Sequence, residues 1–271
     1  MKKSKISDFL LWRETPASFR LRVLIVIAPV VIGLLVLLCL SPVVLNPAYH
    51  LFSDSRAFLG IPHFFNVVTN LAFVLVGLLG LGFLSRHPGC GDIFRERRER
   101  VAYYVLFIGM VLTGFGSGWY HLDPADGSLF WDRLPMILIF MPIFSIVITE
   151  RISLRVGTAL LFPLIILGLA SVFYWRFGGG DQRFYGLVQF YPMFAIPLIL
   201  LLFPPRYTRA GYFWGVIGWY GVAKLCELFD GAIYRWTGII SGHSIKHIFA
   251  ALAVWWILLM LRGRRPLPPG E

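Results

Sequence analysis

Eight long apolar runs divide the chain, and their length constrains what it can fold into. A helix needs about 20 mostly apolar residues to cross the hydrocarbon core of a bilayer. Backbone groups in lipid must be hydrogen-bonded within their own segment, so we expect each run to be a helix. With 58% hydrophobic and 14% charged residues, the chain has too few polar residues to cover a surface in water. The predicted spans are residues 23–44, 64–84, 101–121, 132–149, 157–175, 185–203, 211–230 and 243–261.

The positions of the Lys and Arg residues predict the orientation of these spans. Most of the 25 basic residues fall in segments that an even number of spans places on one side, namely 1–22, 85–100, 150–156, 204–210 and 262–271. The positive-inside rule makes this side, with both termini, cytoplasmic. The net charge of +11 therefore reflects topology, and we expect no nucleic-acid partner.

The predicted fold is an all-α membrane protein, a bundle of seven transmembrane helices with one extra amino-terminal transmembrane helix. Residues 1–63 hold the cytoplasmic amino terminus, the extra helix and an outer loop, 64–262 form the core, and 263–271 are a cytoplasmic tail. The first run is longer than a signal-peptide core and no A-x-A cleavage site follows it, so we expect it to be retained. Short loops and the basic amino terminus suggest a bacterial inner membrane.

Five side chains that can bind a metal or take part in a reaction fall at one depth, near the non-cytoplasmic face. Ser117 and His121 end the third span, Asp132 opens the fourth, and His243 and His247 begin the eighth. Residues spaced i, i+4 lie above one another on a helix face, and two such histidines can bind one metal. Three histidines from two helices leave a fourth position open, as catalytic zinc sites do. These residues therefore predict a zinc site close to this face.

Each of these residues also has a purely structural interpretation. A histidine pair on one helix can be a packing feature or a proton relay, Ser117 can bond its own backbone, and Asp132 can cap its helix. Ionisable groups within a membrane are costly, however, and usually mark function. The convergence of five such groups from three helices favours the metal site.

At these residues the chain resembles a known superfamily. "SGWYH" is an S-x3-H pattern, Asp132 follows eleven residues after the histidine, and "HSIKH" is an H-x3-H pattern. The combination is similar to the superfamily of alkaline ceramidases, adiponectin and progestin receptors and lipid-remodelling proteins. "WDRLPM" and "NVVTN" (66–70) resemble the alkaline ceramidases most, and the resemblance covers about residues 54–262.

The resemblance implies a seven-helix bundle with one zinc ion held by His121, His243 and His247. A water molecule would be the fourth ligand, Asp132 would orient it and take its proton, and Ser117 would hydrogen-bond the developing oxyanion or the water. The implied reaction is hydrolysis of ceramide or a related N-acyl lipid to a long-chain base and a fatty acid. A membrane lipid is thus the expected partner, and no obligate protein partner is evident.

Two departures from the family pattern bear on the substrate. Eukaryotic alkaline ceramidases hold calcium through an acidic cluster, whereas this segment has Asp54 alone and has His63 where a glutamate is usual, so we expect no calcium site. Lys246 replaces a frequent tryptophan. It would neutralise an anionic headgroup or product carboxylate, or extend to the membrane interface, which we favour.

Other polar residues are expected to support the site or to join helices. Asp230 is a candidate partner of a ligand histidine, and Asn66 and Asn70 either contact the site or link helices. Lys224 and Glu227 are expected to pair. Three other functions stay open: a phospholipid ester hydrolase, a zinc-containing receptor or sensor of the adiponectin-receptor type, and a proton-coupled transporter.

Overall fold

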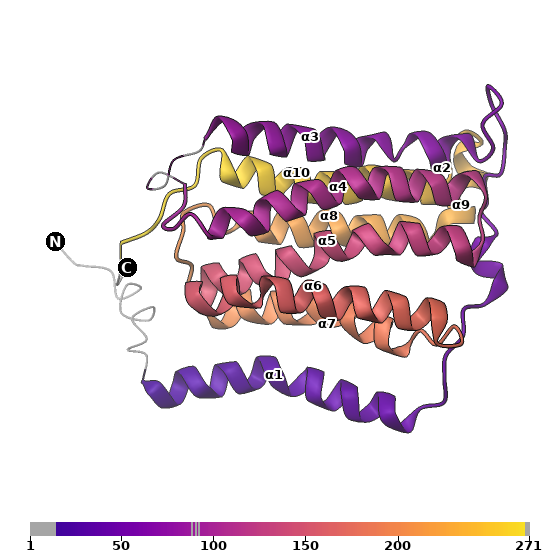
Figure 1. Cartoon of the computed structure of the whole chain (residues 1–271). Helices are drawn as coiled ribbons and strands as arrows, with labels where there is room; N and C mark the ends of the chain where they lie inside the picture. Colours follow the sequence, from indigo (N-terminus) through magenta and orange to yellow (C-terminus); the bar gives the residue numbers. More distant parts are fainter. Residues whose placement is uncertain (1–14, 88, 90, 92, 269–271) are drawn as a thin grey trace.

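The computed structural model describes residues 15–268 apart from residues 88, 90 and 92, and this part of the chain contains helices and isolated bridges but no strand (Figure 1). The amino-terminal cations Lys2, Lys3, Lys5 and Arg13, used in the prediction of orientation, lie outside the described residues. The helices are α1 (Pro16–Cys39), η1 (Pro47–His50), α2 (Phe64–Val68), α3 (Leu71–Arg86), α4 (Glu99–Leu122), α5 (Asp126–Arg151), α6 (Leu154–Phe177), α7 (Arg183–Leu202), α8 (Tyr212–Leu228), α9 (Asp230–Thr237) and α10 (Gly242–Leu261).

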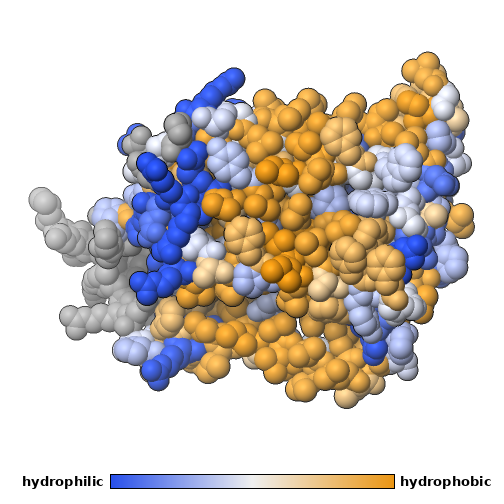
Figure 2. All heavy atoms as spheres, in the orientation of Figure 1, coloured by the Kyte–Doolittle hydropathy of each residue, from blue (hydrophilic) through white to orange (hydrophobic). Residues whose placement is uncertain are grey.

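The long helices run side by side in one bundle, with α1 at its edge (Figure 1). Neighbours in sequence pack most closely, above all α4 with α5, and α8 packs along α10. Hydrophobic side chains cover the middle of the face shown in Figure 2, and hydrophilic ones gather at both ends. This distribution is what a lipid environment requires of a bundle.

Seven helical segments of the described chain are long and apolar enough to span a membrane. They are α1, α2 together with α3, and then α4, α5, α6, α7 and α10. The all-α membrane bundle is therefore confirmed. The predicted span 211–230 is not among the seven, because α8 has only 17 residues before the chain turns at Phe229 into α9.

The second predicted span is interrupted near the site. The Thr69 hydroxyl donates to the Phe65 carbonyl at 2.7 Å, and the Asn70 side-chain amide donates to the Asn66 carbonyl at 2.7 Å. Side-chain donors that take backbone carbonyls compete with the helical ladder. Helix α2 consequently ends at Val68 and α3 begins at Leu71, which leaves Thr69 free to turn toward α10.

Small residues allow α4 and α5 to approach each other next to the predicted site. A Cβ atom on Gly116 would lie 2.1 Å from the Trp131 carbonyl oxygen, a distance that no real contact reaches. Gly116 and Trp131 directly precede Ser117 and Asp132. The glycine therefore sets the separation between the two helices that carry these side chains.

Buried charges hold the opposite end of the bundle together. Arg264, 1% exposed, donates to the Glu150 carboxylate and, at 2.6 Å, to the Tyr103 hydroxyl. The Tyr207 hydroxyl donates to Glu99 at the start of α4. The Arg264 bonds join the segment after α10 to α4 and α5, and the Tyr207 bond joins the connection between α7 and α8 to α4. They lie far along the bundle axis from the residues that the sequence marks as functional.

Helix α1 lies mainly on α7 and is fastened to the neighbouring chain at several depths. The Tyr191 hydroxyl donates to the Val26 carbonyl at 2.9 Å, and the Arg183 guanidinium donates to the Leu37 carbonyl at 3.0 Å. Beyond α1, the backbone amide of Gln182 donates to the Val43 carbonyl at 2.8 Å. The other faces of α1 are largely exposed, as expected of a helix that contacts lipid.

Candidate metal centre

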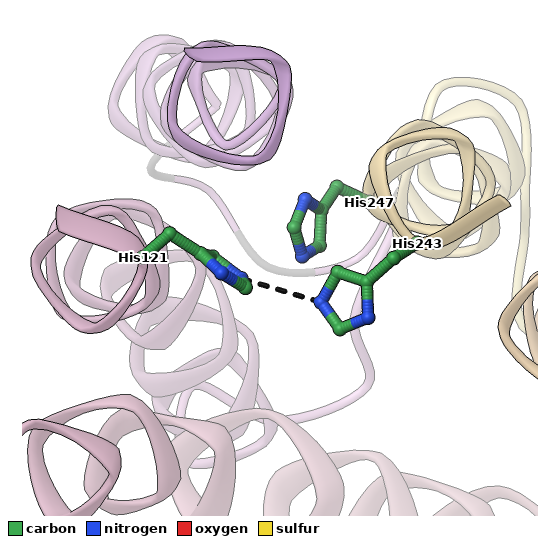
Figure 3. A group of neighbouring side chains, drawn as sticks. All are labelled: His121, His243 and His247. Atoms are coloured by element: carbon green, nitrogen blue, oxygen red, sulfur yellow. Dashed lines mark hydrogen bonds between the residues drawn. The ribbon is translucent and has the colours of Figure 1, made fainter. Parts of the chain in front are cut away.

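Three imidazoles meet where α4 ends and α10 begins. His121 lies in the last turn of α4, while His243 and His247 lie one turn apart near the start of α10 (Figure 3). One ring nitrogen from each lies within 4.8 Å of the others, and the Nε2 atoms of His121 and His243 are 3.3 Å apart. All three residues are buried.

The fold explains why these rings converge. The Ser241 hydroxyl caps the amino terminus of α10, and the backbone amide of His243 donates to the Asp230 carboxylate at 2.6 Å. Gly242 allows α10 to start against the Cys226 carbonyl, because a Cβ atom there would come within 2.1 Å of that oxygen. The first turn of α10 therefore packs closely against the α8–α9 turn, and this contact positions His243 and His247 next to the end of α4.

The hydrogen bond of Thr69 selects the ring nitrogen with which His247 can bind a metal. Its hydroxyl donates to the Phe65 carbonyl and lies 2.9 Å from His247 Nδ1. Since the single hydroxyl proton is committed to the carbonyl, the oxygen accepts from Nδ1–H. The neutral ring then carries its lone pair on Nε2, which is how oriented metal-binding histidines are arranged.

One of the three nitrogen separations has the value expected for two ligands of one zinc ion, and all three nitrogens lie within 4.8 Å of one another. Two ligands at about 2.0–2.1 Å from a tetrahedral centre lie roughly 3.3 Å apart, which matches the separation of the His121 and His243 Nε2 atoms. The Phe52 ring packs edge-on against both imidazoles, with centroid distances of 4.7 Å to His121 and 4.5 Å to His243. The group His121, His243 and His247 can therefore hold a metal ion.

Ser117 and Asp132 lie beside this histidine group. Asp132 was predicted to open its helix, but α5 begins at Asp126, so Asp132 lies within the helix and the capping interpretation is wrong. Its carboxylate is next to the Ser117 hydroxyl and faces the charges of Lys246 and Arg133. Ser117, Asp132 and His247 line one common cavity.

That cavity extends from His247 into the bundle. It has a volume of about 840 Å³ and is walled by α4, α5, α7, α8 and α10 together with the end of α1. Charged side chains line the end near His247, whereas residues such as Phe140, Ile196 and Val216 line the remainder. A polar end joined to a long apolar chamber suits a lipid whose reactive group sits at the head of a hydrocarbon chain.

The structure gives Lys246 and Asp230 partners other than those expected. Lys246 donates to Glu227 at 2.6 Å and lines the cavity, so it does not extend to the membrane interface as we favoured. Glu227 also accepts from Lys224 at 2.6 Å, as its expected pairing requires. Asp230 accepts from the backbone of His243 and from the Ser53 backbone at 3.2 Å, and it thereby supports the helix end instead of an imidazole ring.

The two asparagines connect helices behind the histidines. Asn66 accepts from the Ser244 hydroxyl at 2.6 Å, and Asn70 donates to the Asn66 carbonyl. Both side chains are buried but neither lines the cavity. Of the two expected roles, the contacts favour joining helices.

In the outer loop, the Asp54 carboxylate accepts two hydrogen bonds from the Arg56 guanidinium, at 2.9 Å and 3.0 Å. Burial would raise the pKa of Asp54, but the Arg56 hydrogen bonds and charge outweigh it and hold the pKa below its usual value. Arg56 also donates to the carbonyls of Gly238 and Ile239, so the pair fastens this loop to the end of α9.

Sequence reasoning missed three residues that shape the site: Thr69, Phe52 and Arg133. Thr69 stood within the quoted "NVVTN" segment, so its position was visible although its partner was not. Phe52 gave no signal, since one aromatic residue in a loop is unremarkable. Arg133 follows Asp132 directly and stands within the quoted "WDRLPM" segment, but no role was assigned to it.

Comparison with known proteins agrees with this geometry. The model of the family described as Ceramidase matches residues 59–202, more than half of the chain. The chain belongs to the ceramidase family. The matched segment holds Ser117, His121 and Asp132 and stops before α10, which carries His243 and His247. No curated protein and no solved structure matches the chain.

Family membership indicates the general class of function. It supports a ceramidase-like hydrolase in a membrane, and the buried histidine group is compatible with a metal cofactor. Helix α1 precedes the matched segment, as the predicted extra helix would. The nature of the metal and the bond that is cleaved are matters of proposal.

Proposed function

We propose that the protein is a zinc-dependent intramembrane hydrolase that cleaves the N-acyl bond of ceramide or a related amide lipid. The observation that carries the proposal is a group of three histidines that can hold one metal, of which His247 lines the polar end of a long apolar cavity together with Asp132. Zinc bound by His121, His243 and His247 would supply a Lewis acid that activates water at neutral pH. The products are a long-chain base and a fatty acid.

The residues of the chain divide the remaining work. Asp132 accepts the proton of the attacking water and returns it to the leaving amine. The Ser117 hydroxyl, which hydrogen-bonds the Asp132 carboxylate, is released when Asp132 takes the proton and then donates to the oxyanion that develops on the amide carbonyl. The apolar cavity binds the acyl chain and excludes bulk water from the amide. Amide carbonyls are poor electrophiles, so both oxyanion stabilisation and a positioned base are needed.

Metal analysis combined with a lipid assay tests this proposal. Detergent-purified protein should contain one zinc per chain and release fatty acid from ceramide or another N-acyl lipid faster than from the matched ester. His243→Ala should lose both zinc and activity. His87→Ala is the matched control, since His87 is exposed at the end of α3 and bonds only the Phe83 carbonyl among described contacts.

Two results would redirect the assignment. Faster cleavage of the ester would make the protein a phospholipid-type ester hydrolase with the same site. Full zinc content without release of fatty acid from any amide or ester lipid would contradict the hydrolase and favour a receptor or sensor. We further propose that the zinc site lies near the periplasmic face of a bacterial inner membrane, with both termini cytoplasmic.

A further inference from the structure

Arg133 is a buried cation that the proposed reaction does not use. It is 5% exposed, lies one residue after Asp132 in α5 and lines the same cavity. Its Nη2 atom donates to Gln182 Oε1 at 2.9 Å. Its Nη1 atom is buried and has no hydrogen-bond partner among the described residues.

Aromatic rings hold this guanidinium in place without neutralising it. Its central carbon lies 4.1 Å from the ring centroid of Trp175, 4.5 Å from that of Tyr185 and 5.9 Å from that of Tyr49. Cation–π contacts stabilise a buried cation, but they supply no acceptor for its N–H groups. An arginine cannot lose its proton in compensation, so the free donor is costly unless a ligand accepts from it.

The side chains around the polar end of the cavity carry one more positive charge than negative charges. Arg133, Lys224 and Lys246 stand against Asp132 and Glu227, and Glu227 is shared between the two lysines. Arg183 also lines the cavity, but Asp181 binds it at 2.8 Å. Asp132 faces both Lys246 and Arg133, yet it makes no ion pair with Arg133 within the described chain.

We propose that Arg133 is the headgroup-binding residue of the site and that the substrate is an N-acyl lipid with an anionic headgroup. The free Nη1 donor would bind a sulfonate, phosphate-diester or carboxylate oxygen while the acyl chain lies in the apolar chamber. This assignment rests on the proposed amide hydrolysis for calling the ligand a substrate, but anion binding itself is measurable without turnover.

The first experiment measures binding with probes that cannot be hydrolysed. Dodecane-1-sulfonate and 1-dodecanol share a chain and differ in charge, and their affinities are measured on full-length protein in nanodiscs. The unmodified protein should prefer the sulfonate, and Arg133→Gln should reduce that preference about ten- to hundredfold, as expected for a hydrogen bond between charged groups. Arg176→Gln is the control. It removes an exposed cation that follows Trp175 in the last turn of α6, and it should leave the preference for the sulfonate unchanged.

The second experiment compares kcat/KM for amides that differ only at the head. N-lauroyltaurine and N-lauroylglycine carry a sulfonate and a carboxylate, and N-lauroylethanolamine is neutral. Both anionic amides should be preferred, and Arg133→Gln should act mainly through KM, because the residue binds the head and not the reacting carbonyl. Arg133→Lys keeps the charge and should retain part of the preference, which also covers the case in which the glutamine variant fails to fold.

The outcomes separate this inference from the proposed function. Equal binding of sulfonate and alcohol, or a preference that survives Arg133→Gln, overturns the headgroup site even if amides are hydrolysed. An Arg133-dependent preference in binding supports the site even if no amide is cleaved, in which case the proposed hydrolysis fails alone. Laurate binding that depends on Arg133, with no preference among the amides, would assign the residue to the product and overturn its headgroup role.

Discussion

At the scale of single residues, the site depends on how protons are distributed. The Thr69 hydroxyl faces two neighbours, the Phe65 carbonyl and His247 Nδ1, and has one proton to give. This fixes the tautomer of His247 through a residue that touches no metal. Side chains that orient ligand histidines typically contribute a factor of 10–100 in metal affinity.

Thr69→Val should therefore weaken zinc binding about 10- to 100-fold while the bundle stays folded, because valine has nearly the same shape as threonine. Chelator competition on the purified protein measures the affinity. Thr113→Val is the control, since the buried Thr113 hydroxyl has no hydrogen-bond partner among described residues and also lines the cavity. Equal zinc affinity in the Thr69 variant and the parent protein would refute the orienting role.

Asp132→Asn should keep the metal and lose the reaction. The amide fits where the carboxylate was, but it cannot accept a proton, and positioned general bases contribute about 10²–10⁴-fold in rate. Zinc content and fatty-acid release are measured on the same preparation. A variant as active as the parent would show that another group takes the proton.

Some of these residues were accessible from the sequence and others were not. Spacing along helices and the parity of the spans were enough to bring His121, His243 and His247 together, because both are properties of the chain alone. The partner of Asp230 and the pairing of Lys246 with Glu227 depend on how α8 and α9 meet α10, which no local pattern encodes.

At the scale of helices, the contact between α4 and α5 positions the side chains proposed to bind the metal and to activate the attacking water. Ser117 and His121 come from one helix and Asp132 from the other, and Gly116 permits the close approach that brings them together. Hydropathy located both helices, but it placed the start of α5 six residues late, at 132 instead of 126. Polar residues in the first turns of a membrane helix hide its true beginning.

Gly116→Ala should force α4 and α5 apart and lower fatty-acid release at least tenfold, because small displacements of catalytic groups are costly. The added methyl group would meet the Trp131 backbone, which cannot move aside cheaply. Gly118→Ala is the matched control on the same helix, since a Cβ atom there meets nothing within 4 Å. Full activity of the Gly116 variant would show that the helix contact does not limit the site.

The tether of α1 should respond to acid through Asp181, which lies in the loop before α7. Its carboxylate accepts from the Arg183 side chain and from the Val43 backbone, and these bonds lower its pKa to about 2 despite the opposing effect of burial. A carboxyl with a depressed pKa stabilises the fold above its unfolded pKa of about 4, and this stabilisation is lost as the pH falls toward 2. Thermal unfolding between pH 5 and pH 2.5 should therefore show a decrease in stability that is smaller in Asp181→Asn, because Asp54 still contributes its share.

At the scale of the whole molecule, the two ends of the bundle differ in construction. The end with Arg264 and Glu150 is closed by a buried ion pair, while the opposite end holds the histidines. The distribution of Lys and Arg predicted that the end with Arg264 is cytoplasmic, and this orientation stays a prediction. The predicted span 211–230 treated α8, the turn at Phe229 and the start of α9 as one apolar run, because hydropathy does not detect a turn between two short helices.

Cysteine labelling from either side of the membrane checks this orientation. In a background lacking Cys39, Cys90 and Cys226, Asp123→Cys at the histidine end should react with an impermeant maleimide on intact spheroplasts. Arg155→Cys at the basic end should react only after permeabilisation, as the positive-inside rule requires. Both positions are exposed, so reversed labelling would invert the proposed topology.

The cavity borrows part of its wall from outside the family core. Leu37, Leu40 and Val43, at and beyond the end of α1, line it, although α1 lies outside the segment that matches the family and leans chiefly on α7. Replacing these three aliphatic side chains alters the room available to a hydrocarbon tail and leaves every polar reactive group untouched. The length of tail that fits can thus change at these three positions without a change in the groups proposed to break the bond.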